Sequence, residues 1–171
     1  VHIPTCMGAV VLAYNLPGVD NLKLTGDIIA DIYLGKITKW NDSRIAAINP
    51  GVNLPDKAMS PVYRSDGSGT TFVFSDYMTK VSPEWAEKIG TGKSLKWPVG
   101  MAAKGNPGVA GVISQTEGSI GYVGSEYAFA MKIQFAQMRN AAGNFITPNT
   151  ESISAAAKGD MPADTRTMIT N

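Results

Sequence analysis

Histidine and cysteine are almost absent from this sequence, since each occurs once among its 171 residues. His2 stands alone close to the first residue, so the chain lacks the partners for a Ser-His-Asp triad, a Cys-His pair or a multi-histidine zinc site. Cys6 cannot form an internal disulfide, and we interpret it as a small buried hydrophobe. These absences argue against hydrolases and metalloenzymes, and we expect no catalytic residue, no metal site, no cofactor and no enzymatic activity.

An excess of charge of either sign is also lacking. Lys plus Arg number 15 and Asp plus Glu number 14, which leaves a formal net charge of +1. Nucleic-acid-binding domains normally carry a clustered basic patch, so we expect no nucleic-acid partner. Asp27 and Asp31, four residues apart on an expected helix, are interpreted as a solvated face and not as paired catalytic acids.

Long hydrophobic runs are missing as well. The longest, Met7 to Tyr14, is too short to cross a bilayer, which takes about 20 residues. The first residues lack the charged segment followed by an apolar segment that marks a signal peptide. We therefore expect no direct insertion into a membrane, while export of a processed chain stays open.

Apolar β-rich runs alternate with helical patterns along the chain, which is typical of α/β folds. The length fits one domain, residues 1–171. Strands are expected at 8–16, 60–65, 119–123 and 134–139. Helices are expected after Thr25 up to Gly35 and at 71–81, 82–88, 106–116, 125–131 and 150–158, the last ended by Gly159. Trp40, Trp85 and Trp97 are interpreted as packing residues.

Two glycine-rich segments compete as phosphate sites. Gly90-Thr91-Gly92-Lys93-Ser94 imitates the end of a Walker A loop, but Glu87 stands where that pattern needs its first glycine. The residues before this segment also indicate a helix, whereas a nucleotide-binding loop follows a strand. A phosphoryl-transfer enzyme built on this loop is therefore the least favoured interpretation.

The second segment, Arg64 to Thr71, lies between an expected strand and an expected helix. Gly67 and Gly69 allow a sharp turn and a close approach of the backbone to a ligand. The amides of Gly69 and Thr70 open the helix and lack partners within it, and Ser68 and Thr70 add hydroxyl donors. Arg64 offers a planar fork to a tetrahedral anion, and Asp66 can accept a hydrogen bond from it. The segment predicts an oxyanion site. The helix start at Asn106-Pro107-Gly108 is a second possible anion site, which we interpret as an ordinary cap.

At these residues the sequence strongly resembles the periplasmic phosphate-binding proteins of ABC-type phosphate importers. The resemblance is carried, in the family's order, by residues Gly8 to Gly18, Asp31 to Asp42, Arg64 to Phe74 and Gly118 to Val123. It implies one lobe of a type II periplasmic-binding-protein fold, with a central, mainly parallel sheet flanked by helices. Arg64, Ser68, Gly69 and Thr70 match ligand-contacting positions of the family, and Asp66 matches the acid beside the arginine.

The resemblance covers the stretch that builds the second lobe, and the first lobe is not represented. The family's ligand contacts from the first lobe are therefore missing too. They are an opening Thr-Phe amide contact, a serine, and an aspartate that accepts a proton from the ligand. The resemblance thus implies a chain that carries about half of the anion site. It also implies inorganic phosphate as ligand, a membrane permease as partner of the intact protein, and a periplasmic or cell-surface location. A related oxyanion-binding module with a role in adhesion, signalling or mineral interaction is the alternative.

Overall fold

The computed structural model describes residues 8–158 and residue 169, so the interpretations of His2, Cys6 and Gly159 fall outside the described residues. The strands are β1 (Val10–Tyr14), β2 (Lys23–Leu24), β3 (Ser60–Arg64), β4 (Met101–Ala103), β5 (Ser119–Gly124), β6 (Gln134–Phe135), β7 (Gln137–Arg139) and β8 (Phe145–Ile146). The helices are α1 (Gly26–Tyr33), α2 (Ser43–Ile48), α3 (Gly69–Val81), α4 (Pro83–Lys88), α5 (Gly105–Gln115), α6 (Ser125–Ala130) and α7 (Thr150–Ala156).

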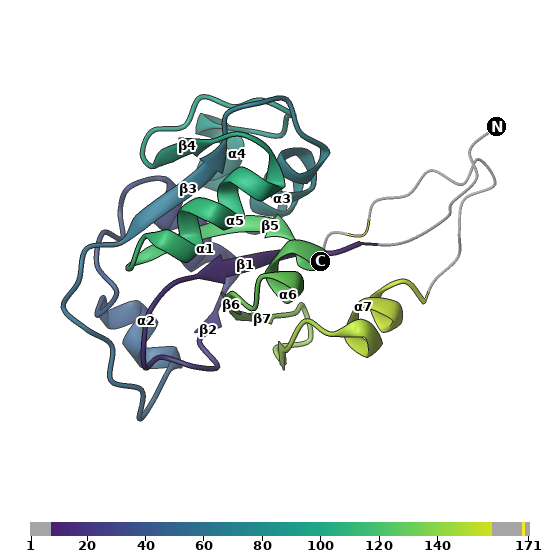
Figure 1. Cartoon of the computed structure of the whole chain (residues 1–171). Helices are drawn as coiled ribbons and strands as arrows, with labels where there is room; N and C mark the ends of the chain where they lie inside the picture. The colour runs from purple at the N-terminus through teal and green to yellow at the C-terminus, as the bar shows by residue number, and fades with distance from the viewer. Residues whose placement is uncertain (1–7, 159–168, 170–171) are drawn as a thin grey trace.

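Five strands form the central sheet, in the order β4-β3-β5-β1-β6. Strand β3 pairs in parallel with β4 and with β5, whereas β1 is antiparallel to both β5 and β6. Only β1 therefore runs against the common direction, and the predicted α/β lobe with a mainly parallel sheet is confirmed. Helices α1, α3 and α4 cover one face of the sheet, and α5 and α6 cover the other (Figure 1).

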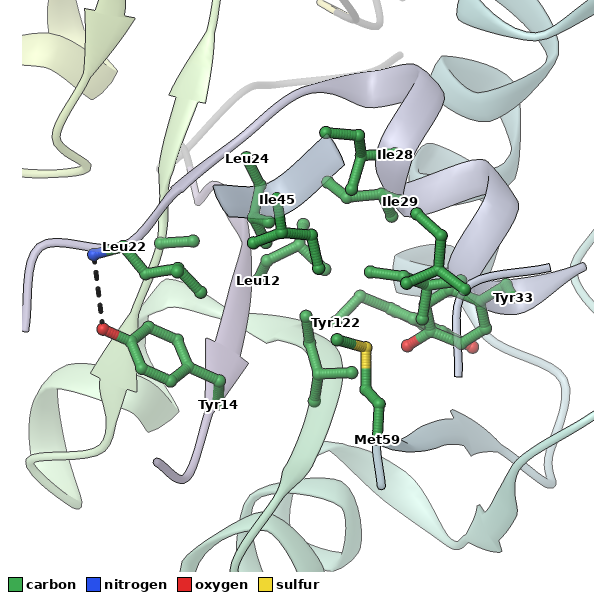
Figure 2. Close-up of a cluster of buried hydrophobic side chains, with 14 of the residues drawn as sticks. Leu12, Tyr14, Leu22, Leu24, Ile28, Ile29, Tyr33, Ile45, Met59 and Tyr122 are labelled. Atoms are coloured by element: carbon green, nitrogen blue, oxygen red, sulfur yellow. Dashed lines mark hydrogen bonds between the residues drawn. The ribbon is translucent and has the colours of Figure 1, made fainter. Parts of the chain in front are cut away.

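The two faces bury two separate hydrophobic clusters, and the alternation of side chains along β1 and β5 divides residues between them. Leu12 and Tyr122 enter the larger cluster, on the side of α1 and α3, while Val11 and Val123 face α5. Figure 2 shows the larger cluster, where side chains from α1 and α2 meet those of the sheet. On the other face α5 lies so close to β5 that a Cβ at Gly121 would be 2.8 Å from Ile113 Cδ1. A side chain at this position would require Ile113 to shift.

Most expected elements are present, but residues 134–139 do not form one strand. The chain pairs with β1 through β6, and from residue 137 it pairs with β2 as part of a separate sheet of order β2-β7-β8. The Ala136 amide still donates to the Leu12 carbonyl, and the next amide, of Gln137, donates to the Leu22 carbonyl. A local β pattern does not reveal such a change of partner, because both halves favour strand equally.

The helix over residues 71–81 is confirmed and begins two residues earlier, as α3 at Gly69. Sequence reasoning missed the short elements β2, α2, β4 and β8, none of which exceeds six residues. Thr25 stands at the N-cap of α1 as expected, although its buried hydroxyl makes no capping hydrogen bond. Trp40 and Trp85 are fully buried and Trp97 packs against the larger cluster, so all three are packing residues.

Candidate functional site

The predicted oxyanion segment lies where β3, β4 and β5 end and α3, α5 and α6 begin. Each of these strands leads within a few residues into its helix, and the three strands run in parallel. The amino ends of the three helices therefore gather at one edge of the sheet (Figure 1). In open α/β sheets, ligands bind at this edge because helix amides with no internal partner are exposed there.

Arg64 is the last residue of β3, and its guanidinium forms a fork with Asp66. Nε donates to Asp66 Oδ1 at 2.8 Å and Nη2 donates to Oδ2 at 2.7 Å. The arginine side chain is 10% exposed, so the nearby carboxylate compensates a largely buried charge. The expected Arg64–Asp66 contact is confirmed, and it leaves Nη1 without a partner among the described residues.

Asp66 is held from a second side. The amide of Gly105, the first residue of α5, donates to Asp66 Oδ1 at 3.0 Å. Hydrogen bonds from Arg64 first, and from the Gly105 amide second, hold the pKa of Asp66 far below its usual range. Asp66 is thus ionised and accepts from the first amide of α5. The helix begins at Gly105 with Lys104 at its N-cap and no capping hydrogen bond from that side chain, so the ordinary cap that we interpreted at Asn106-Pro107-Gly108 does not start it.

The first turn of α3 presents free donors beside this ion pair. Ser68 is the N-cap, and its Oγ accepts from the Thr71 amide at 3.2 Å while its own amide donates to the Lys93 carbonyl. Within the described part of the chain, the amides of Gly69 and Thr70 donate to no protein acceptor. Gly69 is exposed and Thr70 half-buried, so both amides are available to an external acceptor.

The two glycines of the turn act differently from our expectation. Neither Gly67 nor Gly69 has a positive φ, so the turn does not use the left-handed conformations that glycine permits. An added Cβ would meet only Ser94 Oγ at 3.6 Å at the first position and nothing at the second. The value of glycine here is therefore the missing side chain, which keeps the backbone of the turn uncovered.

The Walker-like loop is not a phosphate loop in this structure. It follows α4 and leads into irregular chain, with neither the strand before it nor the helix after it that such a loop needs. Two of its amides are also engaged, because Gly90 N donates to the Trp85 carbonyl and Gly92 N donates to Ser75 Oγ. Through the Lys93 carbonyl the loop instead supports Ser68.

Sequence reasoning missed Tyr122 and did not connect Asn106 with this turn. The Tyr122 hydroxyl accepts from the Arg64 amide at 3.0 Å and shares a 2.8 Å hydrogen bond with Thr71 Oγ1. Asn106 Nδ2 donates to Thr70 Oγ1 at 3.4 Å. A signal for Tyr122 was present, because a tyrosine within a buried strand needs a partner for its hydroxyl, but the partner belongs to segments about 50 residues away.

Other kinds of site are not apparent in residues 8–158. No group of histidine, cysteine or acidic side chains there could hold a metal ion. Among the helices of the described residues, none has the length and hydrophobicity of a membrane span. Asp31 forms surface ion pairs with Arg44 and Lys36, as expected for a solvated helix face. The Arg64-to-Thr71 turn is thus the leading candidate for a functional site.

The fold defines a lobe of the periplasmic-binding-protein class, with free helix amides and the Arg64 guanidinium at one edge of its sheet. A family model described as "PBP superfamily domain" matches residues 1–168, and the chain belongs to that superfamily. The resemblance to phosphate-binding proteins is likewise confirmed by similar sequences. Proteins named phosphate-binding protein PstS are 50% identical in Xylella fastidiosa and 51% identical in Pasteurella multocida, over 91% and 92% of this chain.

The chain spans about half the length of these relatives, 43% and 46% respectively. Solved structures agree on the fold. A high-affinity periplasmic phosphate-binding protein (PfluDING) bound with phosphate superposes with a TM-score of 0.69 at 20% identity, over 91% of this chain and 45% of that one. A phosphate-bound substrate-binding protein from Clostridium perfringens gives 0.63 at 21% identity, over 88% and 51%.

Proposed function

We propose that residues 1–171 form one lobe of a solute-binding protein for inorganic phosphate and carry about half of its anion site. Arg64, Ser68, Gly69 and Thr70 contact the anion, with Asp66 and Gly67 in supporting roles. Binding requires no chemical transformation, in keeping with relatives that are named binding proteins and not enzymes. The intact protein delivers phosphate to the membrane permease of an ABC importer, from the periplasm or the cell surface.

One observation carries the proposal: an arginine fork that is only partly used stands at the same sheet edge as two free helix amides. Asp66 engages Nε and Nη2 of Arg64, and Nη1 stays available. Charged and neutral donors on one rigid edge suit an oxyanion with several acceptor oxygens. An adhesion or mineral-binding module is less favoured, because it has no need for this combination of fork and amides.

The proposal also predicts limited selectivity. Phosphate differs from sulfate at neutral pH by a proton that needs an acceptor. Asp66 is the acid of this site, and its oxygens already accept from Arg64 and from the Gly105 amide. The chain by itself should therefore bind phosphate and sulfate weakly and with similar affinity. Each missing charge-assisted contact from another lobe is worth about 1.5–3 kcal/mol, or one to two decades in affinity.

A titration of the ¹⁵N-labelled chain with phosphate, sulfate, arsenate and ATP-magnesium tests the proposal. The three inorganic oxyanions should shift the amide resonances of Gly69 and Thr70, and ATP-magnesium should have no effect at residues 90–94. Submicromolar binding of phosphate by the chain alone would contradict the half-site. Shifts that avoid the α3 amides altogether would place the site elsewhere.

A further inference from the structure

The hydroxyl of Tyr122 lies between the end of β3 and the start of α3, next to the proposed anion site. Strand β3 is paired with β5 only from Ser60 to Val62. Two residues further on, the Arg64 amide donates to the Tyr122 side chain instead of to the backbone of β5. The same hydroxyl bonds Thr71 Oγ1 in the first turn of α3. It therefore joins the residue that carries the guanidinium to the turn that carries the free amides.

Packing leaves the Tyr122 ring little freedom. Its ring stacks on Phe74 with the centroids 4.3 Å apart and the planes 9° from parallel, and Trp97 stacks at 5.8 Å. The side chain is fully buried, and burial raises the pKa of Tyr122, so the hydroxyl stays protonated at neutral pH and can donate. The Tyr122 hydroxyl is thus a donor and acceptor held in a fixed position between β3 and α3.

We propose that Tyr122 is a positioning residue for the anion site: its hydroxyl holds the Arg64 backbone and the first turn of α3 in the spacing that an oxyanion needs. This inference rests on the proposed function. Ligand binding is tighter when the donors are already in place, because less conformational freedom is lost on binding. Without the hydroxyl, the end of β3 has no bond on its β5 side and is held only by its pairing with β4, so the anion has to order more of the site when it binds.

Tyr33 offers a closely matched control. It is fully buried in the same hydrophobic cluster, beside Tyr122 in Figure 2, with the ring centroids 6.2 Å apart. Its hydroxyl also bonds strand β3, donating to the Val62 carbonyl at 2.8 Å. Tyr33→Phe and Tyr122→Phe therefore remove the same atom from the same environment, but only the second removal is next to the site.

Phosphate titrations of the full chain, followed by the amide resonances of Gly69 and Thr70, separate the two roles. Tyr122→Phe should raise the dissociation constant about three- to tenfold, the range expected for one hydrogen bond, and shift both resonances already in the phosphate-free protein. Tyr33→Phe should lower the melting temperature about as much as Tyr122→Phe does. It should leave the dissociation constant and the two amide resonances unchanged. Equal dissociation constants for the two variants would overturn the positioning role.

Thr71 provides a second, independent arm. Thr71→Val removes the partner of the Tyr122 hydroxyl and should weaken phosphate binding, whereas Thr71→Ser keeps the hydroxyl and should bind like the unmodified chain. Identical binding by these two variants would also overturn the inference. Arg64→Ala distinguishes failure of the proposed function from failure of the positioning role. If Arg64→Ala binds phosphate normally, the proposed function fails. If it loses binding while Tyr122→Phe behaves like Tyr33→Phe, only the positioning role fails.

Discussion

Removal of the Arg64 guanidinium is the most direct test of the proposed site. In Arg64→Ala, the anion loses the hydrogen bonds that Nη1 can offer. Two such charge-assisted bonds are worth about 3–6 kcal/mol, or two to four decades in affinity. The structure adds a second penalty, because Asp66 is then an uncompensated carboxylate next to the anion. We therefore expect phosphate binding by Arg64→Ala to fall below detection.

The double variant Arg64→Ala with Asp66→Asn separates the two penalties. It restores the neutral charge of the original pair without restoring the fork, so it should recover only a small part of the affinity. Arg64→Lys keeps the charge but has no planar fork, and it should bind between the unmodified chain and Arg64→Ala.

Isothermal titration calorimetry and the amide titration should be run together, with circular dichroism to check that each variant is folded. Full recovery by the double variant would refute the reasoning, since Arg64 would then act only by neutralising Asp66. Unchanged phosphate binding by Arg64→Ala would remove the site from this turn altogether.

Further predictions concern the surroundings of the turn. Because its folded-state pKa is depressed, Asp66 stabilises the fold fully above about pH 4, the ordinary carboxyl range, and this stabilisation is lost only as pH falls through the depressed pKa. Its ¹³C carboxyl resonance should stay that of an ionised group well below pH 4, and titration at the ordinary value would contradict the contacts described. Gly105 has a φ of +70°, so Gly105→Ala should lower the free energy of unfolding by about 1–2 kcal/mol in urea. In the same helix, a side chain at Gly111 meets open space, so Gly111→Ala should raise the free energy of unfolding by about 0.5–1 kcal/mol. If both variants changed the stability in the same direction, the backbone strain expected at position 105 would be refuted. Asn106→Asp should weaken phosphate binding about tenfold, because the new carboxylate accepts the Thr70 proton and repels the anion. Tighter binding in calorimetry would speak against that orientation of Thr70.

The local part of the candidate site could be predicted from the sequence because the residues that contact each other there are close together along the chain. Arg64 and Asp66 are two residues apart, and Ser68 caps a helix that begins one residue later. Side-chain chemistry and helix-end rules suffice for such contacts. The same holds for the alternation of strands and helices, which follows from hydrophobic period and from glycine and proline punctuation.

Tertiary structure alone decided which distant segments support the turn. The partners of Asp66 and Ser68 include Gly105 and Lys93, and Tyr122 reaches Arg64 from a strand 58 residues further along the chain. Strand order, the change of partner after β6 and the second sheet were equally inaccessible to local patterns. Hydrogen-bonding groups and β-branched residues indicate that a partner is required, but the identity of the partner depends on how the whole sheet is ordered, which no single segment encodes.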